Sequence, residues 1–196
     1  MLIGVTGQIG SGKTTAAKIL AKMGAAVINA DLIGRKVVET NPVLIKKLAK
    51  YFGDEVVAKA GTLRRGKVAE IAFANPKNRN RLNRLVHPYL LKELRSEIKR
   101  LSKSNKVIVV DAALLLDWSF DRIVDQVLVI HSGLLRRLQR LQRRGIKRSD
   151  ALARQKMQLS YHELRRRADK VILNNSSKME FEKKVKDWGK QFFPTN

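Results

Sequence analysis

The chain has 196 residues, of which 41 are Lys or Arg and 17 are Asp or Glu, giving a formal net charge of +24. The 44% hydrophobic content suits one domain with a buried core, and no apolar run approaches the ~18 residues of a membrane-spanning helix. The absence of cysteine excludes disulfides and thiolate metal sites. We expect a cytoplasmic protein without a secretory signal or membrane partner, whose charge attracts polyanions such as nucleic acid or phosphorylated metabolites.

The first elements in chain order are a strand, a glycine-rich loop and a helix. Residues 3–5 form a short apolar run that predicts a buried strand. The helical pattern of residues 13–23 ends at Gly24, a residue typical of helix C-caps. A second apolar run, 26–28, leads into a helical pattern over 32–38.

The middle third of the chain is predicted to be mostly helical. Leu, Lys, Arg and Glu recur with helical spacing over residues 43–52 and 66–104. We expect breaks at Asn75-Pro76 and His87-Pro88, because the residue before a proline avoids the helical conformation.

Three further strands are predicted in the second half of the chain. The clearest runs over 107–110, where four β-branched residues follow one another, and the others cover 126–130 and 170–173. Strands that alternate with helices indicate an α/β fold with a five-stranded, mostly parallel sheet flanked by helices.

The segment from Gly133 to Lys170 is strongly basic, with thirteen Lys or Arg and three Asp or Glu. Leucines at 134, 138 and 141 predict one packed helix face. The opposite, cationic face is assigned to Arg136, Arg137, Arg140, Arg143 and Arg144. A second basic helix from about Ser149 would complete a hairpin, which suits either a lid that closes over phosphates or a solvated basic face.

The segment Gly7 to Thr14, G-Q-I-G-S-G-K-T, matches the phosphate-binding pattern G-x-x-x-x-G-K-[ST] between a strand and a helix. The backbone N–H groups of such a loop, together with the helix N-terminus, bind phosphate. We expect Lys13 to reach the β- and γ-phosphates, Thr14 to coordinate Mg²⁺ and Thr15 to contact the α-phosphate region. The predicted ATP-binding residues are Gly10, Ser11, Gly12, Lys13, Thr14 and Thr15.

Two aspartates follow predicted strands, and each has two interpretations. Asp111 ends the strand 107–110, where a carboxylate helps to hold Mg²⁺ through water, but an aspartate there is also a common turn or cap residue. Asp31 follows the strand 26–28, where it serves as the base that accepts a substrate hydroxyl proton, as the N-cap of the helix 32–38, or as both.

Other candidate site residues are basic. His87 either contacts a ligand or marks the end of a helix, and its isolation argues against a metal site. Either Arg143 or Arg144 would neutralise charge on a transferring phosphoryl group, as arginine fingers do. Together with the short chain and the lack of a guanine-reading N-K-x-D segment, these residues indicate a small-molecule kinase of the phosphate-binding-loop (P-loop) NTPase fold.

Several motifs in order resemble the dephospho-CoA kinase family from end to end. The family's T-G-G-I-G-S-G-K-[ST] loop corresponds to Thr6–Thr14 and its D-A-D segment to 29–31, which Arg35 follows. Family segments F-A-N-P, L-N-x-L-x-H-P and D-x-P-L-L-F-E correspond to 73–76, 82–88 and 111–117. The lid arginine matches Arg143, fifteen residues before the family glutamine at Gln158, and A-D-x-V-I-x-N-N matches 168–175.

This resemblance implies transfer of the ATP γ-phosphoryl group to the ribose 3′-hydroxyl of dephospho-CoA with Mg²⁺, in the last step of coenzyme A synthesis. It makes Asp31 the general base, with Lys13 and Arg143 as further catalytic residues, and assigns Arg35, His87 and Gln8 to the substrate site. The whole chain, 1–196, would be one P-loop kinase domain. Its core would be 1–29, 106–132 and 169–196, its helical substrate-binding region about 30–105 and its basic lid about 133–168.

The chain departs from the family pattern at Gln8, Asn29, Ala113, Asp117, Leu164 and Ser176. Gln8 replaces a glycine and either contacts substrate or is tolerated. Alternative functions are a nucleoside or nucleoside-monophosphate kinase and a basic nucleic-acid-binding protein with a vestigial nucleotide site. The excess positive charge suits attraction of polyphosphate ligands or incidental, non-specific RNA binding.

Overall fold

The computed structural model describes residues 1–193, apart from the side chains of Arg65 and Phe73, the second of which belongs to the F-A-N-P segment. The chain forms two compact units, residues 1–29 with 100–196 and residues 30–99. Among the described residues, no helix is both long and apolar enough to span a membrane.

The first unit is built on a parallel sheet of five strands, as the sequence predicts. The strands are β1 (Leu2–Thr6), β2 (Ala26–Asn29), β3 (Ile108–Asp111), β4 (Gln126–His131) and β5 (Lys170–Leu173). Their order is β2-β3-β1-β4-β5, and every neighbouring pair is parallel. Because β1 lies between β3 and β4, the loop that follows it leaves from the middle of the sheet.

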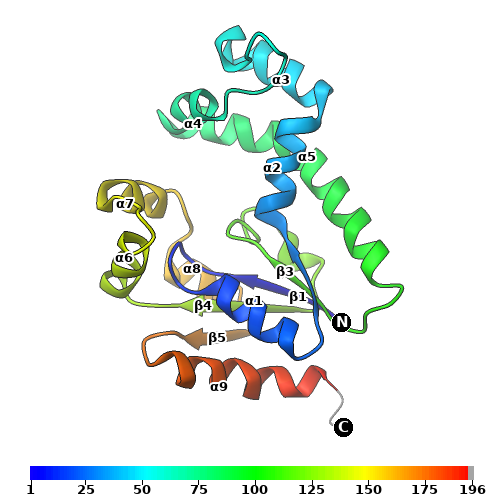
Figure 1. Ribbon diagram of the computed structural model, residues 1–196, viewed down its shortest axis with the longest axis vertical. Coiled ribbons are helices and arrows are strands. Elements are labelled where there is room, and N and C mark those ends of the chain that lie inside the picture. Colours follow the sequence, from blue (N-terminus) through cyan, green and yellow to red (C-terminus); the bar gives the residue numbers. More distant parts are fainter. Residues whose placement is uncertain (194–196) are drawn as a thin grey trace. The chain divides into compact units, whose positions relative to one another are not determined.

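Helices α1 (Lys13–Lys22) and α9 (Lys178–Gly189) cover one face of this sheet, along which Figure 1 shows them lying together. Ile3 and Val5 of β1 are fully buried against them. On the other face, a Cβ atom on Gly4 would lie 2.6 Å from Leu115, so the segment after β3 packs closely there. The alternation of side chains along β1 thus buries both faces of the sheet.

The carboxyl ends of β1, β2 and β3 meet at one edge of the sheet. Asp111 pairs in register with Val5 on one side and with Asn29 on the other. The chain then enters the glycine-rich loop from β1 and α2 from β2. Ligands of open parallel sheets bind at this edge, which makes it the place to look for a site.

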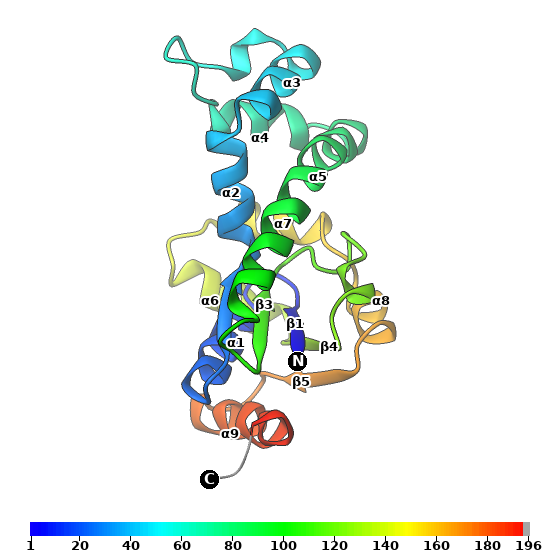
Figure 2. The same ribbon diagram turned by 90° about the vertical axis from the view of Figure 1, so that its right-hand side faces the viewer.

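Residues 30–99 form a separate helical unit with its own core. Its helices are α2 (Ala30–Thr40), α3 (Pro42–Phe52), α4 (Arg65–Phe73) and α5 (Pro76–Leu101), with a 3₁₀ turn η1 (Asp54–Val56), and they are seen together in Figure 2. Val37, Leu44, Leu48 and Phe52 are among the residues buried in the core. Asn41 caps α3 by accepting a hydrogen bond of 3.0 Å from the N–H of Leu44.

The predicted helix break at Asn75-Pro76 is confirmed, but the one at His87-Pro88 is wrong. Helix α5 runs through Pro88 without interruption. The proline removes one backbone donor, yet Val86 before it and Tyr89 after it pack against the core of the unit, and Leu90 and Leu94 further along are buried. Burial of these side chains outweighs the local preference of the residue before a proline.

The basic segment 133–168 contains α6 (Leu134–Gln142), α7 (Arg148–Lys156) and α8 (Tyr161–Arg166). The predicted division of α6 into a leucine face and an arginine face is wrong at two residues. Leu134 is 39% exposed, whereas Arg137 is 3% exposed. Arg137 precedes the buried Leu141 by four residues and therefore lies on the same side of the helix. The remaining short elements are the 3₁₀ turns η2 (Phe120–Arg122) and η3 (Lys190–Phe192).

Candidate functional site

The glycine-rich loop is shaped by positions where a side chain does not fit. Gly12 has a φ of 105° and caps α1, and a Cβ atom on it would lie 2.3 Å from Nδ2 of Asn174. Gly10 has a φ of 78°, and its Cβ would lie 2.9 Å from the carbonyl oxygen of Arg137. Glycine adopts this left-handed conformation without the steric cost that other residues meet. The loop thus follows a path that needs glycine at both positions.

The loop presents positive charge and unused donors to a ligand. Lys13 is the first residue of α1, and its ammonium group makes no hydrogen bond to any residue that the structure describes. The first turn of α1 has no acidic side chain to neutralise the positive end of the helix dipole. Ser11 Oγ is buried and lacks a hydrogen-bond partner within residues 1–193. A phosphate group is the ligand that would satisfy these groups together.

Thr14 and Asp111 are brought together from segments that lie 97 residues apart in the chain. The Thr14 hydroxyl donates a hydrogen bond of 2.7 Å to Oδ2 of Asp111, whose residue is 2% exposed. Carboxylate and hydroxyl oxygens are hard ligands of the kind that Mg²⁺ binds, directly or through water. The chemistry of these two side chains therefore fits a magnesium ion, which they would hold beside the loop.

Residues Gln8 and Ile9 of the loop form hydrogen bonds with the turn between α7 and α8. Gln8 is 8% exposed and donates a hydrogen bond of 3.2 Å from Nε2 to the carbonyl of Leu159. The N–H of Ile9 donates to Oε1 of Gln158 at 2.7 Å. The glutamine that departs from the family pattern therefore contacts the basic segment 133–168, and its role toward substrate stays a prediction.

Three side chains donate hydrogen bonds to the carbonyl oxygens of the loop. Arg137 Nη1 lies 3.4 Å from the carbonyl of Ile9, and Arg140 Nη1 lies 3.3 Å from the carbonyls of Gly10 and Ser11. Asn174 Nδ2 donates to the same Ser11 carbonyl at 2.8 Å and accepts from Arg140 Nη2 at 3.1 Å. Helix α6 and the end of β5 thus enclose the loop from outside.

Sequence reasoning missed the role of these three residues. Asn174 belongs to the A-D-x-V-I-x-N-N segment, so the motif signalled the position without giving its contact. Arg137 and Arg140 are both assigned by the sequence to the cationic face of this helix, which suits either a lid or a solvated face. For Arg137, the spacing of four from Leu141 was a signal of burial. Burial lowers the pKa of both guanidinium groups, and for Arg140 the nearby Arg136 and Arg144 lower it further.

A histidine lies beside this arginine network at the end of β4. His131 stacks on Tyr161 of α8, with 3.7 Å between ring centroids and 24° between ring planes. Burial lowers the pKa of His131, and the positive charge of Arg137 lowers it further. Both effects favour the neutral imidazole.

The other predicted site residues lie in different elements. Arg143 is an exposed residue at the C-cap of α6, and Arg144 follows it in the turn toward α7. In the unit 30–99, Asp31 and Arg35 are exposed on α2, and their spacing of four places them on one side of the helix. His87 is half-buried on α5.

Asp31 is not at the cap position considered for it. Helix α2 begins at Ala30 directly after β2, which places Asp31 inside the first turn. There its carboxylate interacts favourably with the helix dipole. The N-cap interpretation is therefore wrong in its position, and the helix begins two residues earlier than predicted.

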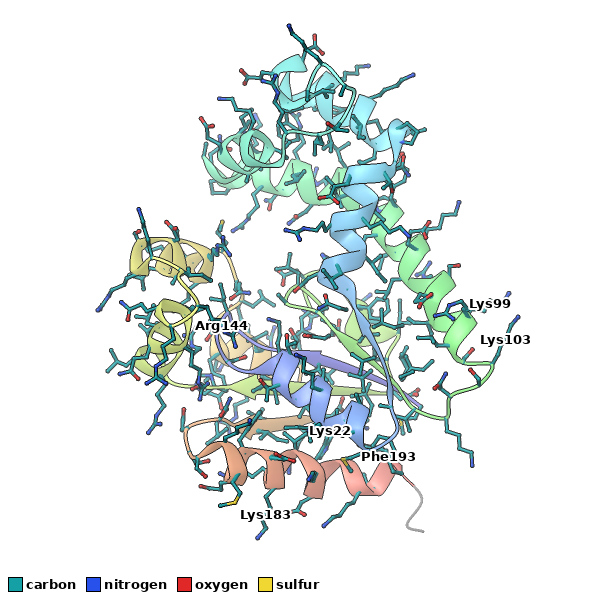
Figure 3. The ribbon with its side chains drawn as sticks, in the orientation of Figure 1. Lys22, Lys99, Lys103, Arg144, Lys183 and Phe193 are labelled. Carbon is teal, nitrogen blue, oxygen red and sulfur yellow. The ribbon has the colours of Figure 1, made fainter. Side chains whose placement is uncertain are left out.

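Many positive charges lie outside the site. Four lysines labelled in Figure 3 are exposed: Lys22 of α1, Lys99 of α5, Lys103 in the turn after α5, and Lys183 of α9. Residues that depart from the family pattern are varied: Leu164 of α8 is 4% exposed and packs as an apolar residue, whereas Asp117 is exposed.

Comparison with known sequences connects this site to one family. The sequence model described as dephospho-CoA kinase matches residues 1–180. A dephospho-CoA kinase of Listeria innocua is 33% identical over 185 residues, which cover 93% of this chain and 92% of the relative. One from Carboxydothermus hydrogenoformans is 35% identical over 202 residues, with 97% and 98% covered.

Similar solved structures include a dephospho-CoA kinase and proteins that share the fold. A protein from Thermus thermophilus has a TM-score of 0.82 at 28% identity, covering 99% of this chain and 98% of its own. The dephospho-CoA kinase from Campylobacter jejuni has a TM-score of 0.71 at 26% identity, with 95% and 94% covered. Shikimate kinase from Acinetobacter baumannii shares the fold, with a TM-score of 0.52 at 16% identity. The match covers 95% of this chain and 89% of that protein.

Proposed function

Because the chain belongs to the dephospho-CoA kinase family and is a kinase with the P-loop NTPase fold, we propose that it transfers the γ-phosphoryl group of ATP to the ribose 3′-hydroxyl of dephospho-CoA. The product would be coenzyme A. The observation that carries the proposal is the hydrogen bond between Thr14 and Asp111 beside a loop whose left-handed glycines and Lys13, at the start of α1, suit an anion. A loop of this kind binds the phosphates of a nucleotide.

The nucleotide would be held by backbone and side chain together. The N–H groups of Gly10 to Thr15 would bind the phosphates, and the ammonium group of Lys13 would contact the β- and γ-phosphates. Ser11 Oγ would gain the hydrogen-bond partner that it lacks among the described residues. Thr14 and Asp111 would hold Mg²⁺, which neutralises charge that develops on the phosphates.

The acceptor would be served by the helical unit 30–99. Asp31 would accept the proton of the ribose hydroxyl as that oxygen attacks the γ-phosphorus, and the bond from phosphorus to the leaving ADP oxygen would break. Arg35 and His87 would contribute to binding of dephospho-CoA. Segment 133–168 would act as a lid that excludes water, with Arg143 neutralising charge on the transferred group. A protein working on these soluble metabolites fits the cytoplasm.

An acceptor screen tests this proposal. Purified protein receives ATP and Mg²⁺ with dephospho-CoA, and separately with adenosine, nucleoside monophosphates or shikimate, while ADP formation is followed. We expect dephospho-CoA alone to raise ADP formation far above the rate without acceptor. Equal stimulation by a nucleoside or nucleoside monophosphate would support the alternative kinase function, and no stimulation by dephospho-CoA would reject the proposal.

A further inference from the structure

Arg137 is a buried cation that touches the outside of the phosphate-binding loop. The residue is 3% exposed, and its Nε donates a hydrogen bond of 2.9 Å to the carbonyl of Ser132. Its Nη1 donates to the carbonyl of Ile9. Both acceptors are neutral, and no carboxylate within residues 1–193 forms an ion pair with this guanidinium.

The bond to Ile9 also sets the direction of a loop donor. Within one planar peptide group, the C=O of one residue and the N–H of the next point in opposite directions. When Arg137 holds the carbonyl of Ile9 toward α6, the N–H of Gly10 is turned the other way. Arg140 and Asn174, which hold the carbonyl of Ser11, likewise turn the N–H of Gly12.

The buried positive charge of Arg137 would be stabilised by a nearby negative charge. Removing a cation from water is costly unless a negative partner or good hydrogen bonds compensate. The partners of Arg137 in the described chain are two carbonyl dipoles. The adjacent loop, by contrast, is the place where several negative charges arrive when a nucleotide binds.

We propose that Arg137 is a positioning residue for nucleotide binding, one that orients the loop through the Ile9 carbonyl and whose buried charge is balanced by the polyphosphate of the bound nucleoside triphosphate. It acts through the loop and does not itself contact the reacting atoms. The inference rests on the proposed function, because it needs the loop to bind the phosphates of ATP.

The decisive variant is Arg137→Gln. A glutamine places its amide nitrogen near the position of the arginine Nε, so the hydrogen bond to Ser132 can remain while the charge and the bond to Ile9 disappear. Arg136→Gln is the matched control, since Arg136 is the preceding residue on the same helix but is exposed. Lys13→Ala reports whether the loop binds ATP.

Two quantities are measured for each protein: the Kd for ATP with Mg²⁺ by calorimetry, and the unfolding temperature with and without ATP. Arg137→Gln is expected to weaken ATP binding by about tenfold or more, as the loss of a poorly screened charge should. Its unfolding temperature without ATP should equal or exceed that of the wild type, because an uncompensated buried charge is gone. Arg136→Gln should stay within about twofold, since exposed charges are screened.

The inference is overturned if Arg137→Gln binds ATP as tightly as Arg136→Gln. It is also overturned if the variant loses thermal stability without ATP but keeps the full stabilisation by ATP, which is the signature of a packing role alone. If Arg137→Gln does not fold, Arg137→Lys decides, with several-fold weaker ATP binding expected and wild-type affinity contradicting the inference. Tight ATP binding by Lys13→Ala would reject the proposed function and this inference together, whereas failure of Arg137→Gln alone rejects only the inference.

Discussion

The Thr14 hydroxyl donates a hydrogen bond of 2.7 Å to the carboxylate of Asp111, which lies 97 residues further along the chain. The parallel pairing of β1 with β3 produces this contact, since it aligns Val5 with Asp111 at the edge where the phosphate-binding loop begins. The sheet topology thus brings together the two oxygen-bearing side chains that we propose hold Mg²⁺.

Asp111→Asn should raise the Mg²⁺ concentration needed for half-maximal activity by roughly 10- to 100-fold, because the variant keeps the shape of the side chain but loses its charge. Thr14→Ala should act in the same direction, whereas Thr14→Ser keeps the hydroxyl and should remain close to wild type. Initial rates over a series of Mg²⁺ concentrations provide the measurement. An unchanged Mg²⁺ dependence in Asp111→Asn would show that this carboxylate does not serve the metal.

Asp31→Asn should lower kcat by about 10² to 10⁴, the range expected when a general base is removed, and should leave the Kd for ATP nearly unchanged. Glu39→Gln is the control, because Glu39 is an exposed carboxylate two turns further along the same helix. Steady-state kinetics and calorimetry give the two quantities. The contrary outcome is that Asp31→Asn folds poorly or binds ATP weakly, while the protein that does fold keeps its kcat. That result would favour a structural role for Asp31 in the first turn of α2.

Gln8→Met should loosen the turn between α7 and α8. Methionine fills a similar volume but cannot donate to the carbonyl of Leu159, so we expect faster amide hydrogen exchange over residues 157–160 and a free energy of unfolding lower by about 1 kcal/mol. Gln8→Gly, which restores the family residue, should show the same exchange. Wild-type exchange in both variants would mean that the hydrogen bond does not hold this turn, and would leave substrate contact as the role to test for Gln8.

The stability of the protein should fall in mildly acidic solution because of His131. Its pKa in the folded protein is lowered from 6.5, first by burial and then by Arg137. The unfolded chain therefore takes up a proton more readily, so the free energy of unfolding decreases as pH falls below about 6.5 and levels off below the folded pKa. His131→Phe keeps a ring against Tyr161 but cannot titrate.

Denaturant unfolding at several pH values compares the two proteins. Wild type should lose more stability than His131→Phe between neutral and mildly acidic pH. Parallel pH profiles would contradict the lowered pKa. In Arg137→Gln, where one of the two causes is absent, nuclear magnetic resonance should show that the pKa of His131 moves up toward its ordinary value.

Local patterns in the sequence predict the sheet and the phosphate-binding loop because each depends on neighbours in the chain. The β-branched run 107–110 favours a strand, and the spacing from Gly7 to Thr14 predicts a phosphate-binding loop between a strand and a helix. Asp111 could be placed near the loop only as one of two interpretations, since its contact with Thr14 depends on strand order.

The errors occur where distant packing decides. Pro88 lies inside a helix because the apolar residues around it pack against the core of the unit 30–99. The loop carbonyl that the buried Arg137 contacts belongs to Ile9, 128 residues away in the chain, so the helical pattern of α6 does not contain this partner. Residue type favours solvent for an arginine, and a spacing of four from Leu141 does not by itself outweigh that preference.

The most direct test of the central claim is the identity of the phosphorylated product. Dephospho-CoA is incubated with the purified protein, ATP and Mg²⁺, and the product is examined by mass spectrometry and phosphorus nuclear magnetic resonance, with Asp31→Asn treated in parallel. The account predicts one new phosphate monoester on the ribose 3′-oxygen, formed by the wild type and at a greatly reduced rate by the variant. Unchanged dephospho-CoA, or a phosphate at another position, would contradict it.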